Sequence, residues 1–296
     1  MASSWPNVFS VDVEEYFQVS AFERRFPREQ WDSIPSRLDR GLDAVLEIAG
    51  GARVRGTFFV LGWIARRHPA AVRRIVAAGH EIGCHGADHG LLYRMDRASF
   101  RDDLRSALRA VEDASGARCR VYRAPSFSVT RRSLWSLRVL AEEGIRIDSS
   151  VFPVVHDRYG IPGAPRFPFR PLRDAPDFVE FPPSTVRIAG LTLPCAGGGY
   201  FRLLPLWVTR KAVRRIRERD GWPALLYLHP WEFDPGQPVV PAPRLTTFRH
   251  RVNLGRTSER LAELFRRFEF DTMSRVVEAM GGAGALPVAE LGSGGS

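Results

Sequence analysis

Short apolar runs alternate with longer amphipathic stretches along the first half of the chain. The runs are rich in Val, Ile, Phe and Leu and end in polar residues, which is typical of buried strands. We predict strands at residues 8–13, 56–61, 81–84, 120–124 and 145–148. Apolar positions three and four apart predict helices at about 37–48, 68–79, 96–114 and 130–143, the first with Ser36 as its N-cap. Strands that alternate with helices in this way favour a parallel sheet with crossover helices.

The alternation pauses between residues 151 and 205, a stretch rich in Pro and Gly with short strand-like pieces at 178–181 and 186–193. This stretch is too short for a core of its own, so we interpret it as an insertion over one face. The pattern then resumes with a helix at 206–219, an apolar strand at 224–228, a helix at 258–268, a strand at 268–272 and a short helix at 274–280.

The whole pattern predicts an α/β fold with one domain at residues 1–290 and a flexible Gly/Ser tail at 291–296. Units of about 30 residues suit a (β/α) barrel or an open doubly wound sheet. No Gly-x-Gly-x-x-Gly follows the first strand, which counts against a dinucleotide-binding fold.

Composition narrows the classes of function. The net charge is +10, but Lys211 is the only lysine, and this skew towards Arg indicates a coding bias. No motif of a nucleic-acid reader accompanies the charge, so we expect no nucleic-acid partner. Three cysteines without a Cys-x-x-Cys spacing argue against disulfides and a structural zinc knuckle. The chain shows neither a long apolar run nor a signal peptide, so we expect a cytoplasmic protein without a transmembrane segment.

Polar residues gather where the predicted strands end. In α/β barrels and doubly wound sheets, the carboxyl ends of the strands form the edge where active sites lie. Five residues share this position in the pattern, at or just past the end of a strand: Asp12, His85, Arg123, Asp148 and His229.

His85 and His89 stand four residues apart, a spacing that places both imidazoles on one face of a helical turn, where they can share a divalent metal ion. Asp12 and Glu14 share one face of the first strand, whereas Glu15 points the other way. One of the two carboxylates on that face can complete a metal site, and the other can accept a proton from the bound water.

Six stretches resemble, in order, the motifs of polysaccharide deacetylases of the NodB-homology type (carbohydrate esterase family 4). They are Ser10–Phe17, Thr57–Phe59, His85–His89, Arg123–Ser128, Asp148–Pro153 and Leu228–Glu232. Two more, Gly197–Arg202 and His250–Thr257, resemble signature stretches of the subgroup found beside exosortase and PEP-CTERM exopolysaccharide loci. That subgroup has a C-terminal extension, here about residues 235–290.

The resemblance implies a distorted (β/α) barrel of about seven strands and a hydrolase that removes N-acetyl groups with a divalent metal ion. Zinc is the first choice of metal, with cobalt or nickel as alternatives. By resemblance, His85 and His89 are metal ligands, Asp12 is the catalytic base held by Arg123, and His229 is the general acid oriented by Asp148.

The first motif departs from the family pattern. Many members carry adjacent Asp-Asp, whereas this chain has Asp12-Val13-Glu14-Glu15. A related Asp-x-Asp variant matches Asp12 and Glu14, so we predict Glu14 as the third metal ligand, with Glu15 as its rival.

Further residues are expected to contact the substrate. A backbone N–H from Ser126 or Phe127, just after Pro125, is predicted to stabilise the oxyanion, and Tyr200 and Trp231 to stack on sugar rings. The expected substrate is an exopolysaccharide that contains N-acetylhexosamine, or its lipid-linked precursor. Exopolysaccharide assembly machinery at the inner membrane face is an expected partner.

Two other functions stay open at this stage. A cyclic amidase of the allantoinase-like branch would keep the fold and bind a small substrate in a closed pocket. A catalytically inactive glycan-binding subunit would not need all of Asp12, His85, His89, Arg123 and His229.

Overall fold

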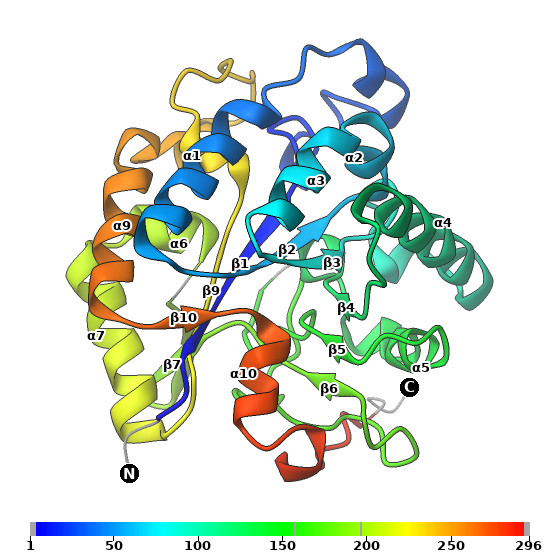
Figure 1. Ribbon diagram of the computed structural model, residues 1–296, viewed down its shortest axis with the longest axis vertical. Helices are drawn as coiled ribbons and strands as arrows, with labels where there is room; N and C mark the ends of the chain where they lie inside the picture. The colour runs from blue at the N-terminus through cyan, green and yellow to red at the C-terminus, as the bar shows by residue number, and fades with distance from the viewer. Residues whose placement is uncertain (1–3, 157, 196, 293–296) are drawn as a thin grey trace.

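The computed structural model describes residues 4–156, 158–195 and 197–292. In it, strand β1 (Asn7–Val13) is an interior strand of the sheet, with a neighbour on each edge (Figure 1). It pairs in parallel with β2 (Thr57–Val60) on one edge and with β9 (Leu225–Leu228) on the other. All seven residues of β1 are buried, because both its edges and both its faces are covered.

Strand β10 (Phe270–Asp271) pairs with the first residues of β1. The N–H of Asn7 donates to the carbonyl oxygen of Glu269 at 2.9 Å, and the next N–H, of Val8, donates to that of Ala224 at 2.8 Å. Successive N–H groups of a strand point to opposite edges, so β10 lies on the edge of β1 away from β9.

Beyond β2 the sheet continues through β3 (Glu81–Cys84), β4 (Val121–Tyr122), β5 (Ile147–Asp148) and β6 (Val179–Glu180), with every pair parallel. The order β9-β1-β2-β3-β4-β5-β6 makes a curled sheet of seven strands, with β10 added beside β1. This arrangement confirms the predicted α/β fold and the distorted barrel of about seven strands.

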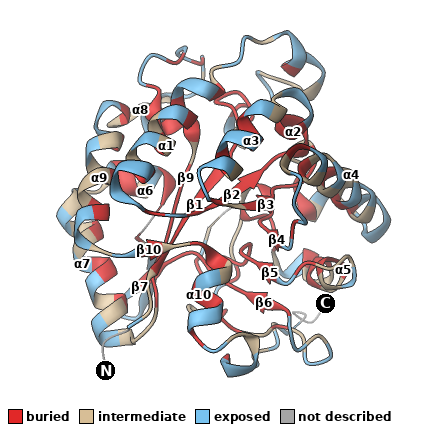
Figure 2. Ribbon diagram, viewed as in Figure 1, coloured by how far each residue is buried: buried red, intermediate tan, exposed pale blue. Residues whose placement is uncertain are grey.

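Helices cover the outside of the sheet and turn a buried stripe towards it (Figure 2). In α1, Leu38, Leu42, Val45 and Ala49 are buried, at the spacing of an amphipathic helix. The helices are α1 (Leu38–Ala52), α2 (Gly62–Arg67), α3 (Pro69–Ala77), α4 (Arg97–Ser115), α5 (Trp135–Glu142), α6 (Gly198–Leu203), α7 (Leu206–Arg215), α8 (Arg244–Arg251), α9 (Thr257–Arg267) and α10 (Met273–Ala279).

Three of these helices are absent from the sequence-based prediction. α2 and α6 are only six residues long, and α8 buries only His250, so none of them shows an apolar stripe. The helix expected at 130–143 is a 3₁₀ turn, Arg131–Ser133, followed by α5.

The stretch at 151–205 is not wholly an insertion, because β6 lies within it and belongs to the main sheet. With two residues, β6 is too short to produce a periodic signal. The stretch also holds an antiparallel hairpin of β7 (Thr185–Ile188) and β8 (Leu191–Pro194). No described helix has the length and apolarity needed to cross a membrane. Of the tail predicted to be flexible, residues 293–296 lie outside the described residues.

Candidate active site

Polar side chains converge where β1, β3 and β9 end, around a cavity of about 110 Å³. Parallel strands bring their carboxyl ends to one edge, which is why residues far apart in the sequence meet here. Eight of the predicted site residues line the cavity: Asp12, Glu14, His85, His89, Ser126, Phe127, His229 and Trp231. Arg123, Asp148, Pro125 and Tyr200 are not among its walls.

Glu14, His85 and His89 bring their ligand atoms within 4.8 Å of one another. Oε2 of Glu14 lies 2.8 Å from Nε2 of His89 and 4.0 Å from Nε2 of His85. Nδ1 of His85 lies 2.8 Å from the carbonyl oxygen of Arg123, which places the proton on Nδ1 and leaves Nε2 free for a cation. One carboxylate and two imidazoles are a donor set of catalytic zinc sites, so these three residues fit a divalent metal ion.

The two histidines do not lie on a helical turn, as their spacing predicts. Residues 85–90 form a loop after β3, with Gly86 and His89 in the left-handed region at φ 77° and 58°. The carbonyl oxygen of Gly86 accepts the N–H of Gly62 at 2.9 Å and is therefore engaged with α2. The left-handed backbone, rather than helical periodicity, brings the ring of His89 within 5.7 Å of that of His85.

Glu15 points away from the histidines. Its carboxylate accepts the hydroxyl of Ser36 and the N–H groups of Arg37 and Leu38, at 3.0 and 3.1 Å, where α1 begins. Glu15 therefore caps α1, because its carboxylate accepts the unpaired N–H groups at the start of the helix. The sequence predicts Ser36 as the N-cap and gives no sign of a carboxylate 21 residues earlier. The geometry leaves Glu14 as the carboxylate beside the two histidines.

The protonation states of these groups suit a cation. Burial raises the pKa of Glu14, but the charge and hydrogen bond of His89, with the charges of His229 and His85, lower it to about 2. Burial lowers the pKa of His85 to about 4. An ionised carboxylate and a neutral imidazole are the forms that bind a metal ion.

Asp12 and Arg123 form a buried ion pair, with Nη1 and Oδ1 2.6 Å apart. Nε of Arg123 also donates to the carbonyl oxygen of Ser149 at 3.3 Å, and its guanidinium lies 4.2 Å from the ring centre of Phe59. Oδ2 of Asp12 stays on the cavity side, 3.9 Å from Nε2 of His229. Arg123 thus fixes the direction of the Asp12 carboxylate from behind.

Glu232, not Asp148, orients His229. Nδ1 of His229 lies 2.7 Å from Oε1 of Glu232, which also accepts the backbone N–H of His229 at 3.0 Å. Oε2 of Glu232 accepts from Nε of Arg202 at 2.5 Å, and the side chains of Glu232 and Arg202 are 0% and 1% exposed. Arg202 in turn donates to the backbone carbonyl oxygens of residues 249, 250 and 252.

These contacts set the charge of His229. Burial lowers its pKa, but the hydrogen bond of Glu232 and the charges of Glu14, Glu232 and Asp12 raise it to about 9. At neutral pH the ring therefore carries a proton on Nε2, which faces the cavity 3.7 Å from Oε1 of Glu14.

Asp148 is fully buried at the end of β5, beside Glu180 of β6. Its Oδ1 accepts the hydroxyl of Ser150 at 2.5 Å, and Oε1 of Glu180 accepts the N–H of Ser150 at 3.1 Å. Burial raises the pKa of Asp148 to about 6. Burial, together with the charge of Asp148, raises the pKa of Glu180 well above its ordinary value. The pair supports the turn whose Ser149 binds Arg123.

Backbone strain is concentrated at the cavity. Six described non-glycine residues have positive φ, and three of them, His89, Ser126 and Phe127, line the cavity. Such conformations cost on the order of 1–3 kcal/mol each and persist where function needs them. The N–H of Phe127 donates to the carbonyl oxygen of Ala124 at 3.0 Å, which leaves that of Ser126 as the predicted oxyanion donor. Pro125 is buried behind this turn.

Trp231 does not offer an open face to a sugar ring, contrary to the sequence-based prediction. The indole is stacked against the rings of His229 and His250, with centroids 5.0 and 4.4 Å away, and is only 9% exposed. Its Nε1 donates to Oε1 of Glu14 at 3.2 Å. Trp231 therefore contacts both Glu14 and His229 and helps to fix their positions.

Three residues of this network, Arg202, Glu232 and His250, have no role in the sequence-based prediction. The available signal for Glu232 was its spacing three residues after His229, across a 3₁₀ turn that begins with Pro230. Arg202 and His250 lie in the two stretches that resemble the subgroup signature. Arg202 contacts Glu232, 30 residues later, and His250 contacts Trp231, 19 residues earlier. Contacts over such separations produce no periodic pattern in the sequence.

Comparison with known sequences matches two families. Residues 31–145 match the family described as polysaccharide deacetylase, and residues 149–278 match a domain of unknown function, DUF3473. These matches confirm the predicted resemblance to polysaccharide deacetylases.

Curated relatives match over a shorter stretch. The chain is 39% identical over 70 residues to a chitooligosaccharide deacetylase of Bradyrhizobium sp. (strain ANU 289), which covers 24% of this chain and 32% of that protein. It is 38% identical over 70 residues to a chitooligosaccharide deacetylase of Sinorhizobium fredii, covering 24% and 33%. The matched stretch thus spans about a third of those relatives.

Among solved structures, a Mycobacterium smegmatis protein described as a candidate polysaccharide deacetylase superposes with a TM-score of 0.66. The two are 22% identical, and the match covers 98% of this chain and 96% of that one. This likeness supports the fold over the full length of the chain.

Proposed function

We propose that this chain, which carries a polysaccharide deacetylase domain, hydrolyses the N-acetyl groups of N-acetylhexosamine residues in a glycan. One observation carries the proposal: Glu14, His85 and His89 meet Asp12 and His229 around a single cavity. A cation site, a carboxylate base and a protonated imidazole are the groups that metal-assisted hydrolysis of an amide uses.

We propose Glu14, His85 and His89 as ligands of a divalent ion, which would supply a Lewis acid for an acyl oxygen and for a water molecule. Two imidazoles and one carboxylate suit zinc first, and cobalt or nickel as alternatives.

The side chains divide the proton transfers between them. Asp12 accepts a proton from the attacking water at Oδ2, since Arg123 holds Oδ1. The N–H of Ser126 stabilises the oxyanion. His229 donates its Nε2 proton to the amide nitrogen as the C–N bond breaks, which releases acetate and a free amine, while Glu232 holds its Nδ1.

The shape around the cavity supports a polymer rather than a small cyclic amide. The cavity shares Ser20 and His89 with a pocket of about 580 Å³, and Val19 and Trp231 with another of about 510 Å³. A cyclic amidase needs only a small closed pocket.

We propose an exopolysaccharide, or its lipid-linked precursor, as the glycan, because residues 197–202 and 250–257 resemble the exopolysaccharide-locus subgroup. Assembly machinery at the inner face of the membrane is the corresponding partner. A cytoplasmic location is supported by Cys84, Cys119 and Cys195, which are free and buried, as is typical of a reducing compartment.

Acetate release from N-acetylglucosamine oligomers by zinc-loaded protein tests the proposal. We expect acetate from the wild type and a loss of at least about a hundredfold in Asp12→Asn, as for removal of a general base. Equal behaviour of the two proteins on every N-acetylhexosamine oligomer would contradict the proposed function.

A further inference from the structure

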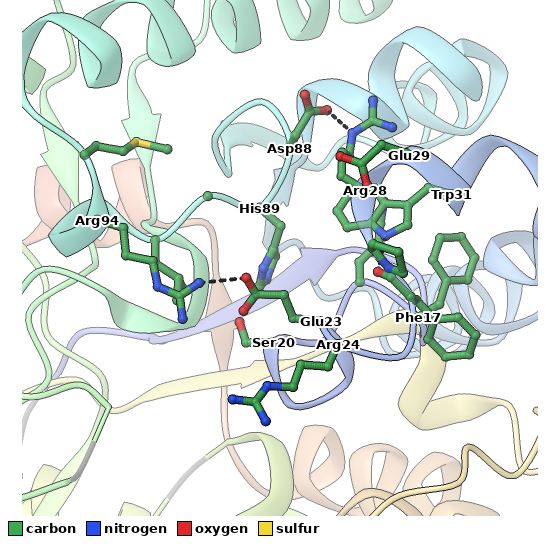
Figure 3. Close-up of a pocket in the computed structure, with 16 residues that line it drawn as sticks. Phe17, Ser20, Glu23, Arg24, Arg28, Glu29, Trp31, Asp88, His89 and Arg94 are labelled. Carbon is green, nitrogen blue, oxygen red and sulfur yellow. Dashed lines mark hydrogen bonds and ion pairs between the residues drawn. The ribbon is translucent and has the colours of Figure 1, made fainter.

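Two larger pockets share wall residues with the cavity, and the two pockets differ in charge. The first, of about 580 Å³, is closed in by aromatic rings, among them Phe17 and Trp31. Its described walls hold three arginines and three acidic residues, and Arg28–Asp88 and Arg94–Glu23 form ion pairs at 3.1 and 2.7 Å (Figure 3). This first pocket is therefore close to neutral.

The second pocket, of about 510 Å³, begins at Trp231 and holds Arg158, Arg202 and Arg249 but no acidic residue among its described walls. Arg202 is neutralised by Glu232 behind the wall. Arg158 and Arg249 are exposed, and no ion pair joins either of them to a described residue. Two guanidinium groups thus face the pocket with their charge available.

Two histidines, His156 and His250, also line the second pocket, and the buried His250 adds no positive charge to it. Burial, with the charge of Arg202, lowers the pKa of His250 to about 3. Its Nε2 is engaged by Oε1 of Gln237 at 2.7 Å. The arginines bring positive charge to the pocket, and their forked donors match the oxygens of carboxylates and phosphates.

We propose that the second pocket binds an anionic group, a carboxylate or a phosphate, that the glycan carries beside the N-acetylated sugar. This inference rests on the proposed function and specifies its substrate class. A glycan that crosses the cavity places the acetylated sugar over Asp12 and His229, a neutral sugar in the first pocket and the charged unit against Arg158 and Arg249.

Three oligosaccharides of equal length test the proposal and separate the two sources of charge. One is neutral oligo-N-acetylglucosamine, the second alternates N-acetylglucosamine with glucuronic acid, and the third ends in a diphosphate. Wild type is compared with the double variant Arg158→Gln/Arg249→Gln. The matched control, Arg73→Gln/Arg97→Gln, makes the same change of charge at exposed residues of α3 and α4 outside the pocket.

We expect wild type to prefer one anionic oligosaccharide over the neutral one in kcat/KM. That ratio should fall roughly 10- to 100-fold in the pocket variant, as for loss of charge-assisted hydrogen bonds, and stay unchanged in the control. Preference for the uronate identifies a carboxylate and preference for the diphosphate a phosphate. No preference in wild type, a ratio that survives in the pocket variant, or an equal fall in the control overturns the inference.

Binding to Asp12→Asn, measured by titration calorimetry, keeps this test separate from the proposed function. If no oligosaccharide releases acetate, the proposed function fails, yet preferential binding of an anionic oligosaccharide that depends on Arg158 and Arg249 still supports the pocket. Equal binding of the neutral and anionic oligosaccharides contradicts it.

Discussion

Replacing Glu232 by Gln removes one negative charge and leaves the size of the side chain unchanged. In the native protein Glu232 connects His229 to Arg202 through contacts of 2.7 and 2.5 Å in a fully buried position. The substitution therefore acts on the orientation and charge of His229 without touching the cavity wall itself.

The substitution should lower both the free energy of unfolding and kcat/KM. Removing one partner of a buried ion pair costs about 3–5 kcal/mol, and the lower end applies because Arg202 keeps its bonds to three carbonyl oxygens. The charge-assisted bond to His229 is worth about 1.5–3 kcal/mol. If that bond acts in the transition state, kcat/KM falls about 10- to 150-fold.

The pH profile distinguishes this role from loss of structure. The charge of Glu232 raises the pKa of His229, so its removal lowers that pKa and the proton is lost at lower pH. We expect the alkaline limb of kcat/KM to move to lower pH in Glu232→Gln. Glu142→Gln is the control, since it breaks an exposed pair with Arg101 worth at most about 1 kcal/mol.

Acetate release between pH 5 and 10, with urea unfolding of each variant, provides the measurements. An alkaline limb that stays in place while the rate falls would refute the role of Glu232 in holding His229. So would wild-type activity in a folded Glu232→Gln protein.

Three further predictions concern metal, pH and the indole. Glu14→Gln should lose bound zinc by elemental analysis, whereas Glu15→Gln should keep it and lose about 1 kcal/mol of unfolding free energy as a missing helix cap; equal zinc contents contradict this. Burial raises the pKa of Asp148 to about 6, so the folded state favours the protonated carboxyl. This group therefore contributes its full free energy of unfolding below its ordinary pKa of about 4, and the contribution is lost as pH rises through 6. Asp148→Asn should therefore raise Tm over wild type more at pH 8 than at pH 5, and equal differences at the two pH values would contradict the raised pKa of Asp148. Trp231→Phe keeps an aromatic ring at this position but removes the N–H that donates to Glu14. The affinity for zinc, measured by competition with a chelator, should therefore fall about 10- to 100-fold. An unchanged affinity would show that the hydrogen bond is dispensable.

The strands could be predicted wherever burial on both faces leaves a continuous apolar run. β1 was expected at 8–13 and spans Asn7–Val13, and β3 was expected at 81–84 and spans Glu81–Cys84. β6 has two residues, and its place in the sheet depends on its parallel register with β5, which no local pattern encodes.

The sequence likewise predicts the position of some residues of the candidate site but not the contacts between them. Asp12, His85 and His229 follow strand ends, so the strand prediction places them at one edge. The family resemblance implies that Asp148 orients His229, but the side chain of Asp148 accepts the hydroxyl of Ser150 instead. Which carboxylate faces a given imidazole depends on rotamers and loop geometry, and these appear only in three dimensions.

The pairing of β1 with β9 also sets when the candidate site can be completed during synthesis. The hydroxyl of Ser10 bonds the carbonyl oxygen of Leu226, 216 positions later. At about 5–20 residues per second, the nascent β1 waits roughly 10–40 seconds for its second neighbour. Throughout that interval the strand that carries Asp12 has an open apolar edge, of the kind that recruits other chains. The late synthesis of β9 therefore brings His229 to the candidate site and covers the open edge of β1 in the same event.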